Sequence, residues 1–319
     1  MNRAEQASEQ PIQSQQTKAG MAIKATLWTL ASLFLLLFFS LLKLPEIRLK
    51  NLIHGHIVNA LASQGLSLTT NKSEFSYFLG MSYDMEDVII SGGSLTQPIK
   101  IQKISISPSV LPLFLGRFGA GISLKQTEGK LKGSVSFKAT TPEPTFWTDL
   151  TLDKLDLGKL GVFQLLGGVQ AGGITQGTLS FSGTLSDPKS MNGTADLKFS
   201  KIAIESQSIA GFNVPKSQIS DGELVFDIVT GKVAIKKLQF GKHQNPSDDI
   251  YALGSGEVDL NSRFGASKLN ADLAFGFSQK IQKAFLLLDA LLADGKTGEG
   301  AYAYHFAGTF DDPVRTPKK

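Results

Sequence analysis

The sequence predicts a mainly β protein: an N-terminal transmembrane helix followed by a long, curved, largely antiparallel β-sheet with a few short amphipathic helices. Three observations lead to this fold class. Residues 25–42 form an uncharged apolar run, apolar and polar side chains alternate from residue 75 onward, and one eight-residue unit recurs five times in that part. Alternation with a period of two is typical of strands that bury one face, and antiparallel sheets can leave the other face in water.

The composition permits one large or two ordinary domains and favours no catalytic chemistry. The 319 residues include 32 glycines, four histidines and no cysteine. Disulfides and thiolate metal sites are therefore excluded, and few residues are present that could form a catalytic triad or a zinc site. We predict that the protein is not an enzyme and has no cofactor and no metal site. The net charge of +4 is spread along the chain, which indicates a solvated basic surface and no nucleic-acid partner.

The chain begins with a tail and a predicted membrane anchor. Residues 1–20 are rich in Gln and Ser without apolar periodicity, which predicts a disordered cytoplasmic tail. The anchor is expected at 21–43, because a helix over the run 25–42 would be roughly 27 Å long, close to the thickness of a hydrocarbon core. The side chains expected to lie in the bilayer are Trp28, Leu30, Leu33, Phe34, Leu36, Phe38 and Leu41.

The anchor is expected to remain attached to the mature protein. No motif of small residues for signal-peptide cleavage follows it closely, which favours a single uncleaved span. Lysine and arginine flank the run on both sides, so charge bias does not decide the orientation. A short tail before a single span most often stays in the cytoplasm. We therefore expect residues 43–319 to lie outside the inner membrane, in the periplasm.

Residues 44–66 are predicted to form a membrane-proximal amphipathic helix. Ile53, Ile57 and Leu61 recur at four-residue spacing, and Gly65 is a plausible C-terminal stop. His54 and His56 are two residues apart, which places them on different sides of a helix. Metal ligands on a helix prefer a spacing of three or four, so we expect two exposed histidines. Residues 67–316 then form the β-rich domain.

The recurring unit reads apolar-x-apolar-x-Lys-apolar-x-apolar. It occurs at 99–106, 150–157, 197–204 and 233–240, and at 83–90 with Asp87 in place of the lysine. A three-residue step between apolar positions would move the second pair to the wrong face of a regular strand. Either a β-bulge supplies an extra residue, or the strand bends where the covered face changes. Both interpretations place the charged residue at the irregular point, namely Lys103, Lys154, Lys201 and Lys237.

A second repeat predicts where strands end. "FSGTLSDPK" at 181–189 returns as "FAGTFDDPV" at 306–314. Each copy alternates like a strand with one apolar face, and its Asp-Pro ends the strand because proline has no amide hydrogen for a ladder. Neither copy holds a nucleophile or a set of metal ligands. We interpret the repeat as architectural.

Three interruptions of the strand pattern are expected to be helical: 108–119, 157–168 and 278–295. In the last of them Ser278 is an N-cap, Gly295 ends the helix, and the apolar stripe consists of Ile281, Phe285, Leu288 and Leu292. Its "GKT" at 295–297 is not a phosphate-binding loop, because a helix and not a strand precedes it. We expect these segments to be lids at the mouth or ends of the sheet.

One face of such a sheet is apolar and needs a cover. The cover could be the sheet folded on itself, the three helical segments, or lipid, and the sequence leaves these alternatives open. The residues expected to line an apolar groove are Ile101, Leu152, Phe199, Ile235, Phe181 and Phe306. The carboxylates Asp84, Glu86, Asp87, Asp248 and Asp249 are expected on a solvated surface or as turn caps.

The order of these segments resembles a known family. "LKLPEIRLKNLI" and "GLSL" lead into glycine-rich strands with "ISPSVLPLFLG", "TLDKLDLGKL", "GTLSFSGTLSDP" and "GAYAYHFAGTFDDP". Over roughly residues 25–316 this is similar to the longer form of the type II secretion system protein N (GspN) family, and more distantly to AsmA-like proteins. The resemblance implies an anchored protein of the bacterial inner membrane with most of its chain in the periplasm, and it brings no catalytic residues.

Two functions follow from the resemblance. The first is an accessory or scaffold component of type II protein secretion, whose partners are other secretion-system or envelope proteins, bound by sheet edges or by the membrane-proximal helix. The alternative is an AsmA-like lipid-binding or lipid-transfer protein, in which the sheet forms an apolar groove for phospholipid acyl chains.

Overall fold

The structure is a computed structural model that describes residues 46–76, 81–93, 95–109, 116–138, 144–184, 186–209, 212–298 and 300–318, together with Ser32. The chain divides into two compact units, Met1–Ile53 and His54–Lys319, and the sheet lies in the second unit. The predicted tail lies outside the described residues, as do the seven predicted anchor side chains. Among the helices within the described ranges, none is long and apolar enough to cross a membrane.

Strands make up most of the second unit. The strands are β1 Leu66–Thr69, β2 Lys72–Ser76, β3 Ser82–Gly92, β4 Ile99–Ser109, β5 Phe118–Lys125, β6 Lys130–Lys138, β7 Thr145–Asp156, β8 Ala171–Thr184, β9 Asp187–Ile204, β10 Gln207–Ile209, β11 Phe212–Val214, β12 Ser217–Val229, β13 Lys232–Phe240, β14 Ile250–Asp259, β15 Lys268–Phe277, β16 Lys296–Gly298, β17 Ala301–Thr309 and β18 Pro313–Pro317. The helices are α2 Glu46–Ala62, α3 Val162–Gly167, α4 Gln279–Ala284 and α5 Leu288–Leu291, with the 3₁₀ turns η2 Phe264–Ala266 and η3 Ala293–Gly295.

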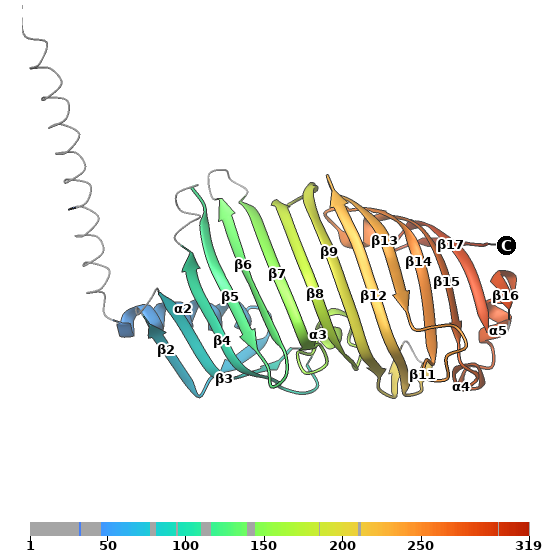
Figure 1. The fold of residues 1–319 in the computed structure, drawn as a ribbon, viewed down its shortest axis with the longest axis horizontal. Helices are drawn as coiled ribbons and strands as arrows, with labels where there is room; N and C mark the ends of the chain where they lie inside the picture. The colour runs from blue at the N-terminus through green and yellow to red at the C-terminus, as the bar shows by residue number, and fades with distance from the viewer. Residues whose placement is uncertain are drawn as a thin grey trace, which may run out of the picture. The chain divides into compact units, whose positions relative to one another are not determined.

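Sixteen of these strands form one antiparallel sheet, which confirms the predicted mainly β class. Its order is β1-β3-β4-β5-β6-β7-β8-β9-β12-β13-β14-β15-β17-β16, with β2 also on β3 and β18 also on β17. Figure 1 shows the strands side by side, almost in chain order. Among the described strands, no pairing joins the two ends, so the sheet is not closed. β10 and β11 form a separate two-stranded sheet.

The sheet has one apolar face. Residues paired directly across an antiparallel ladder point to the same side, so the register defines rows of side chains. One row runs through six successive strands as Leu197, Leu224, Leu238, Gly254, Leu273 and Tyr304. We call the side that carries this row the apolar face, and the opposite side the polar face.

Ion pairs gather on the polar face. Lys237 Nζ lies 2.6 Å from Glu223 Oε2, and Lys232 Nζ lies 2.8 Å from Glu257 Oε2. The alternation in the sequence therefore separates apolar from charged side chains, as an antiparallel sheet with one solvated face requires.

Lys154 lies at a β-bulge, as the first interpretation of the recurring unit predicts. Leu152 pairs with Gly177 and Leu155 with Thr175. Between these two pairs β7 advances by three residues and β8 by only two. Lys154 adopts a positive φ of 51°. Leu152 and Leu155 are both buried, at 8% and 2% exposure, so the extra residue keeps both on the apolar face.

Two other units confirm this interpretation. Lys201, with a φ of 52°, lies where β9 takes three residues against two in β8. Between Ile235 and Leu238, the pairing of β13 shifts by one residue relative to both of its neighbouring strands, β12 and β14. The bulge therefore includes Lys237.

The first two units differ from the other three. Asp87 has a φ of 51°, but the first of the two interpretations, a bulge, is wrong for Lys103: β3 and β4 keep their register there, and Lys103 has no positive φ. Ile104 pairs with Met85, and Ile101 pairs with Val88. Both strands therefore advance by three residues between these two pairs, and neither contains an extra residue. Lys103 instead lies 2.8 Å from Asp84 on the polar face.

The bulge at Lys154 predicts a stability effect. A β-branched residue tolerates a positive φ poorly, so Lys154→Val should lower the free energy of unfolding by about 2 kcal/mol, while Lys154→Gly should leave it unchanged or raise it slightly. Lys132→Val, in the regular part of β6, is the matched control and should change it by less than about 0.5 kcal/mol. Denaturant unfolding of the purified full chain measures these differences. Equal stability of the two valine variants would contradict the strain at Lys154.

Each copy of the Phe-x-Gly-Thr repeat ends a strand, but the strand ends at the threonine, so the prediction that Asp-Pro ends it is wrong. β8 ends at Thr184 and β9 begins at Asp187, while β17 ends at Thr309 and β18 begins at Pro313. Each Asp-Pro instead lies at the start of the next strand of a hairpin. The Asp312 amide donates to Thr309 Oγ1 at 3.1 Å and fixes the second turn.

The helical predictions are partly correct. α3 lies within 157–168, but residues 108–109 belong to β4 and 118–119 to β5, and 110–115 are outside the described residues. Phe118 belongs to the sheet and stacks on Phe137, with ring centroids 5.9 Å apart. The helix expected over 278–295 is broken into α4, α5 and η3, because Phe285 leaves the helical conformation.

Candidate functional site

The six predicted groove residues lie on the apolar face. Ile235 and Phe306 belong to one row, which also contains Phe226 and Ala271. Phe181, Phe199, Leu152 and Ile101 pair respectively with Gly193, Gly222, Leu131 and Val88 of the same face. Ile101 and Leu152 are buried, and the other four are half-buried. The predicted residues are thus on one surface, but they are not equally accessible.

Glycines on the apolar face make room for large neighbours. A Cβ atom added at Gly193 would lie 2.5 Å from the ring of Phe181, and one at Gly222 would lie 2.7 Å from Cε1 of Phe240. A large side chain therefore lies across each of these glycines, an arrangement that covers the bare backbone of a strand. This packing explains why glycine occupies these two positions.

The face is covered at the N-terminal end of the sheet. His54 Nδ1 of α2 lies 2.9 Å from the hydroxyl of Tyr83, whose side chain is 1% exposed. The prediction that His54 is an exposed histidine was wrong, because a tyrosine buried on an apolar face needs a hydrogen-bond partner and the helix supplies it. His56 is exposed, as expected. Next to this end, the loop before α3 packs Gly161 against Ile99.

The face is also covered at the C-terminal end of the sheet. Tyr302 and Tyr304 of β17 have no exposed surface, and their hydroxyls donate to Asp289 at 2.8 Å and to Asp294 at 2.5 Å. Gly295 packs on the ring of Tyr304. Burial and the neighbouring Asp289 carboxylate raise the pKa of Tyr302 to about 12. The segment 278–295 is therefore a lid over this end, as predicted.

The central strands carry the uncovered part of the apolar face. Within the described residues, no helix packs extensively on β9, β12 or β13. Leu197, Leu224 and Phe226 of these strands are half-buried, and Phe226 stacks on Phe181 of β8 with ring centroids 6.3 Å apart. On β5 and β6, further along the same face, Phe118 and Phe137 are 54% and 45% exposed. Among the described residues of β9, β12 and β13, the rows through Leu197, Phe199 and Phe226 contain no charged side chain, so this surface can hold apolar molecules by burial alone. In the part of the chain that the structure describes, no three side chains are placed to bind a metal ion.

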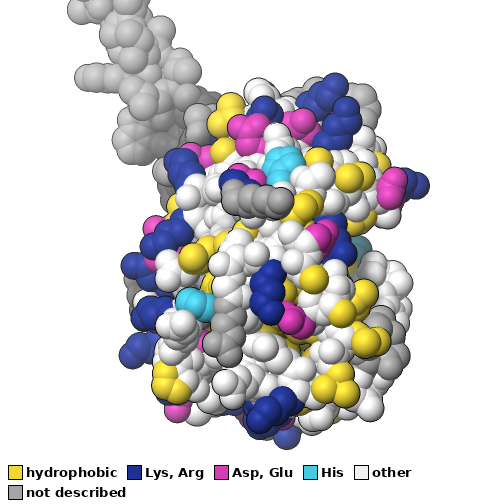
Figure 2. Space-filling model, turned by 90° about the vertical axis from the view of Figure 1, so that its right-hand side faces the viewer, with side chains coloured by type: hydrophobic (Ala, Val, Ile, Leu, Met, Phe, Trp, Pro, Cys, Tyr) yellow, Lys and Arg dark blue, Asp and Glu magenta, His cyan; other side chains and the backbone are white. Residues whose placement is uncertain are grey.

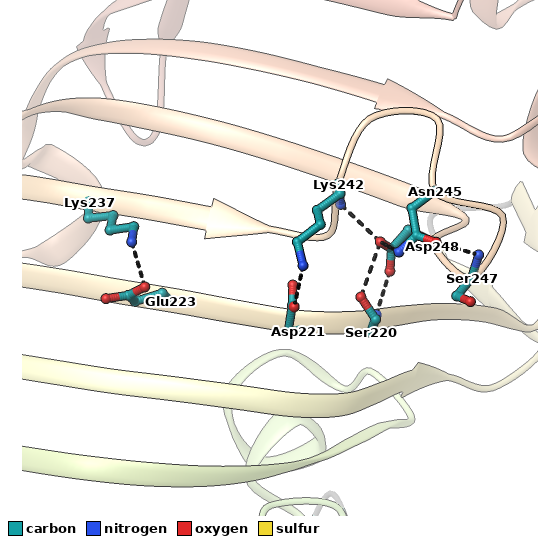
Figure 3. A network of polar contacts seen from close by, with 8 residues as sticks. All are labelled: Ser220, Asp221, Glu223, Lys237, Lys242, Asn245, Ser247 and Asp248. Carbon is teal, nitrogen blue, oxygen red and sulfur yellow. Dashed lines mark hydrogen bonds and ion pairs between the residues drawn. The ribbon is translucent and has the colours of Figure 1, made fainter.

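A polar network lies at the ends of β12 to β14, beside a hollow of about 720 Å³. The Asp248 carboxylate accepts hydrogen bonds from the backbone amide of Ser220 at 2.5 Å, from that of Lys242 at 2.9 Å and from the side chain of Asn245 at 2.7 Å. Figure 3 shows these residues around the carboxylate. Burial raises the pKa of Asp248, but these hydrogen bonds outweigh it and hold the pKa below its usual value.

The neighbouring Asp249 is held in a similar way. Its carboxylate accepts from Lys280 Nζ at 2.8 Å and from Ser278 Oγ at 2.9 Å, so it ties α4 to the sheet. Asp248 and Asp249 are 7% and 9% exposed. Their expected role as turn caps is confirmed for Asp248, whereas a solvated surface is wrong for both. A local pattern does not show this burial, because the partners are up to 31 residues away.

Comparison of the chain with protein-family models, curated proteins and solved structures found no match. The resemblance to the GspN family and to AsmA-like proteins therefore remains a prediction from the sequence.

Proposed function

We propose that the protein binds phospholipid acyl chains on the uncovered part of its apolar face, as a non-enzymatic lipid-binding or lipid-transfer protein anchored in the bacterial inner membrane. In this proposal the sheet is the AsmA-like groove and the residues from 43 onward lie in the periplasm. The observation that carries the proposal is one apolar face that continues across the sheet, is covered at both ends and is uncovered over β9, β12 and β13.

The energetics support an apolar occupant. Apolar surface left in water costs about 25 cal/mol per Å², so a few hundred Å² amount to several kcal/mol. Each methylene group of an acyl chain removed from water contributes about 0.8 kcal/mol. A row of aromatic and aliphatic side chains without charges offers this burial to a chain of methylene groups without desolvating any ion.

Accessory scaffolding in type II secretion is the second function that the resemblance implies, and the sheet edges favour it less. The outer strands are short: β1 has four residues, β16 has three and β18 has five, with proline at both ends of β18. Short edge strands and edge prolines limit the addition of a partner strand. Binding of secretion-system proteins is therefore the second proposal, and the experiment below separates the two.

Site-specific photo-crosslinking tests the proposal. Benzoyl-phenylalanine replaces Phe181 or Phe226 on the apolar face of the full chain in bacterial cells, and Thr178 or Thr194 on the polar face as matched controls. After irradiation, mass spectrometry of the purified protein should find phospholipid adducts at 181 and 226, with much less at 178 and 194. The replacement keeps the aromatic ring of Phe181 and Phe226 and extends it by a benzoyl group, and an unchanged thermal midpoint confirms that the fold accepts it.

The other results are equally informative. Crosslinks from 181 and 226 to other polypeptides, without lipid adducts, would overturn lipid binding and favour the scaffold. Equal lipid adducts at all four positions would mean that lipid contacts the protein without selecting the apolar face.

A further inference from the structure

Three leucines at the C-terminal end of the sheet point into solvent. Leu286, Leu287 and Leu291 are 85%, 72% and 61% exposed. They lie in the turn between α4 and α5 and within α5, and we call them the leucine tip. Figure 2 views the unit from this end and shows hydrophobic side chains interspersed with lysine and arginine.

The segment does not need these leucines for its own packing. The predicted apolar stripe faces inward, because Ile281 is buried and Phe285, Leu288 and Leu292 are half-buried. The tip adds apolar residues on the outward side of the same segment. A helical segment that is apolar on both sides is one that contacts a second apolar environment.

The tip is held in place by several polar contacts. Lys280 pairs with Asp249 at 2.8 Å, Gln282 Nε2 donates to the carbonyl of Phe277 at 2.8 Å, and Asp289 pairs with Lys296 at 2.8 Å. Together with the hydrogen bond from Tyr302 to Asp289, these contacts fix both sides of the turn on the sheet. The exposure of the leucines is therefore built into the fold.

The charges around the tip match an anionic membrane surface. Both acidic residues of the segment have polar partners. Asp289 contacts Lys296 and Tyr302, and Asp294 accepts a hydrogen bond from Tyr304. Lys283 is exposed and, among the described residues, makes no ion pair. Leucines beside an uncompensated lysine are typical of segments that lie in the interface of an anionic bilayer. Protein interfaces are instead depleted in lysine and enriched in aromatic residues.

We propose that the leucine tip inserts into the interfacial region of an anionic lipid bilayer, with Lys283 facing the headgroups, and so gives the sheet a membrane contact of its own. The contact is separate from the predicted anchor at 21–43. It does not depend on acyl-chain binding by the apolar face, because the tip and the uncovered strands are different surfaces.

The absence of cysteine makes a local test possible. A single Leu287→Cys variant of the full chain carries an NBD fluorophore, and Leu253→Cys is the matched control, an exposed leucine on the polar face of β14. Vesicles of phosphatidylethanolamine and phosphatidylglycerol should raise the NBD emission at 287 by about twofold or more and shift it to the blue, since the probe leaves water. Doxyl-labelled lipids should quench it. The probe at 253 should not respond.

Two further variants define the chemistry. Leu286→Ser with Leu291→Ser should abolish the response at 287, and Lys283→Gln should reduce the preference for anionic vesicles over phosphatidylcholine vesicles. An unchanged thermal midpoint confirms that these exposed substitutions leave the fold intact. No response at 287, an equal response at 253, or a response that appears without vesicles as protein concentration rises would overturn the proposal. The last result would assign the tip to a contact between copies of the chain.

Discussion

Gly177→Ala should lower the free energy of unfolding by at least about 3 kcal/mol, because it combines backbone strain with a clash that only backbone movement can relieve. Gly177 has a φ of 143° in β8. A Cβ atom there would overlap the carbonyl oxygen of Asp196 and lie 3.0 Å from its carbonyl carbon. Asp196 belongs to β9, so relief of the clash would separate two central strands.

Gly172→Ala in the same strand is the control for this substitution. Its φ is not positive, and an added Cβ would lie 3.6 Å from the nearest atom, which is ordinary contact. This change should alter the free energy of unfolding by less than about 1 kcal/mol. Denaturant unfolding of the full chain compares the two variants. If both have the same midpoint, the close approach of β8 and β9 at Gly177 is incorrect.

Asp248→Ala is the second substitution with a large expected effect. The substitution removes the carboxylate that accepts hydrogen bonds from the Ser220 and Lys242 amides and from the Asn245 side chain. These donors then lose their acceptor at a largely buried position. Each hydrogen bond to a charged group contributes about 1.5–3 kcal/mol, so we expect a loss of about 3–5 kcal/mol. Asp221→Asn, which removes one exposed ion pair with Lys242, should cost less than about 1 kcal/mol.

The same carboxylate predicts a pH dependence. The folded pKa of Asp248 lies below its ordinary value, because the hydrogen bonds to the carboxylate outweigh the effect of burial. Its stabilising contribution is therefore fully present above the unfolded pKa of about 4 and is lost as the pH falls through the folded pKa. The unfolding free energy of the native chain should decline below about pH 4, and that of Asp248→Asn should decline less. Parallel acid-unfolding curves for the two would contradict this assignment.

Much of the sheet could be predicted from local patterns. Alternation assigns Leu197 and Phe199 to one face and Lys198 to the other, because strand geometry depends only on neighbouring residues. The three-residue steps around Lys154 and Lys201 predict bulges, since one slipped residue would otherwise expose an apolar pair. Asp187-Pro188 predicts a strand boundary because proline lacks an amide hydrogen.

The octet pattern did not predict the backbone where two paired strands both contain the unit. At Lys103 the same octet occurs without a bulge, because the partner strand has an equal step at Asp87. A bulge is a property of a pair of strands, so the sequence of one strand does not decide it.

The sequence by itself determined that this chain forms strands with one apolar face, and that Lys154, Lys201 and Lys237 lie at irregular points of their strands. These features depend on the period of the side chains and on the chemistry of single residues. Only the tertiary structure decided which parts of the apolar face are covered. His54 contacts Tyr83, and Asp289 contacts Tyr302, while no described helix packs extensively on β9, β12 or β13. The reason is that burial depends on which distant segments meet, and alternation records only which side of its own strand a residue takes.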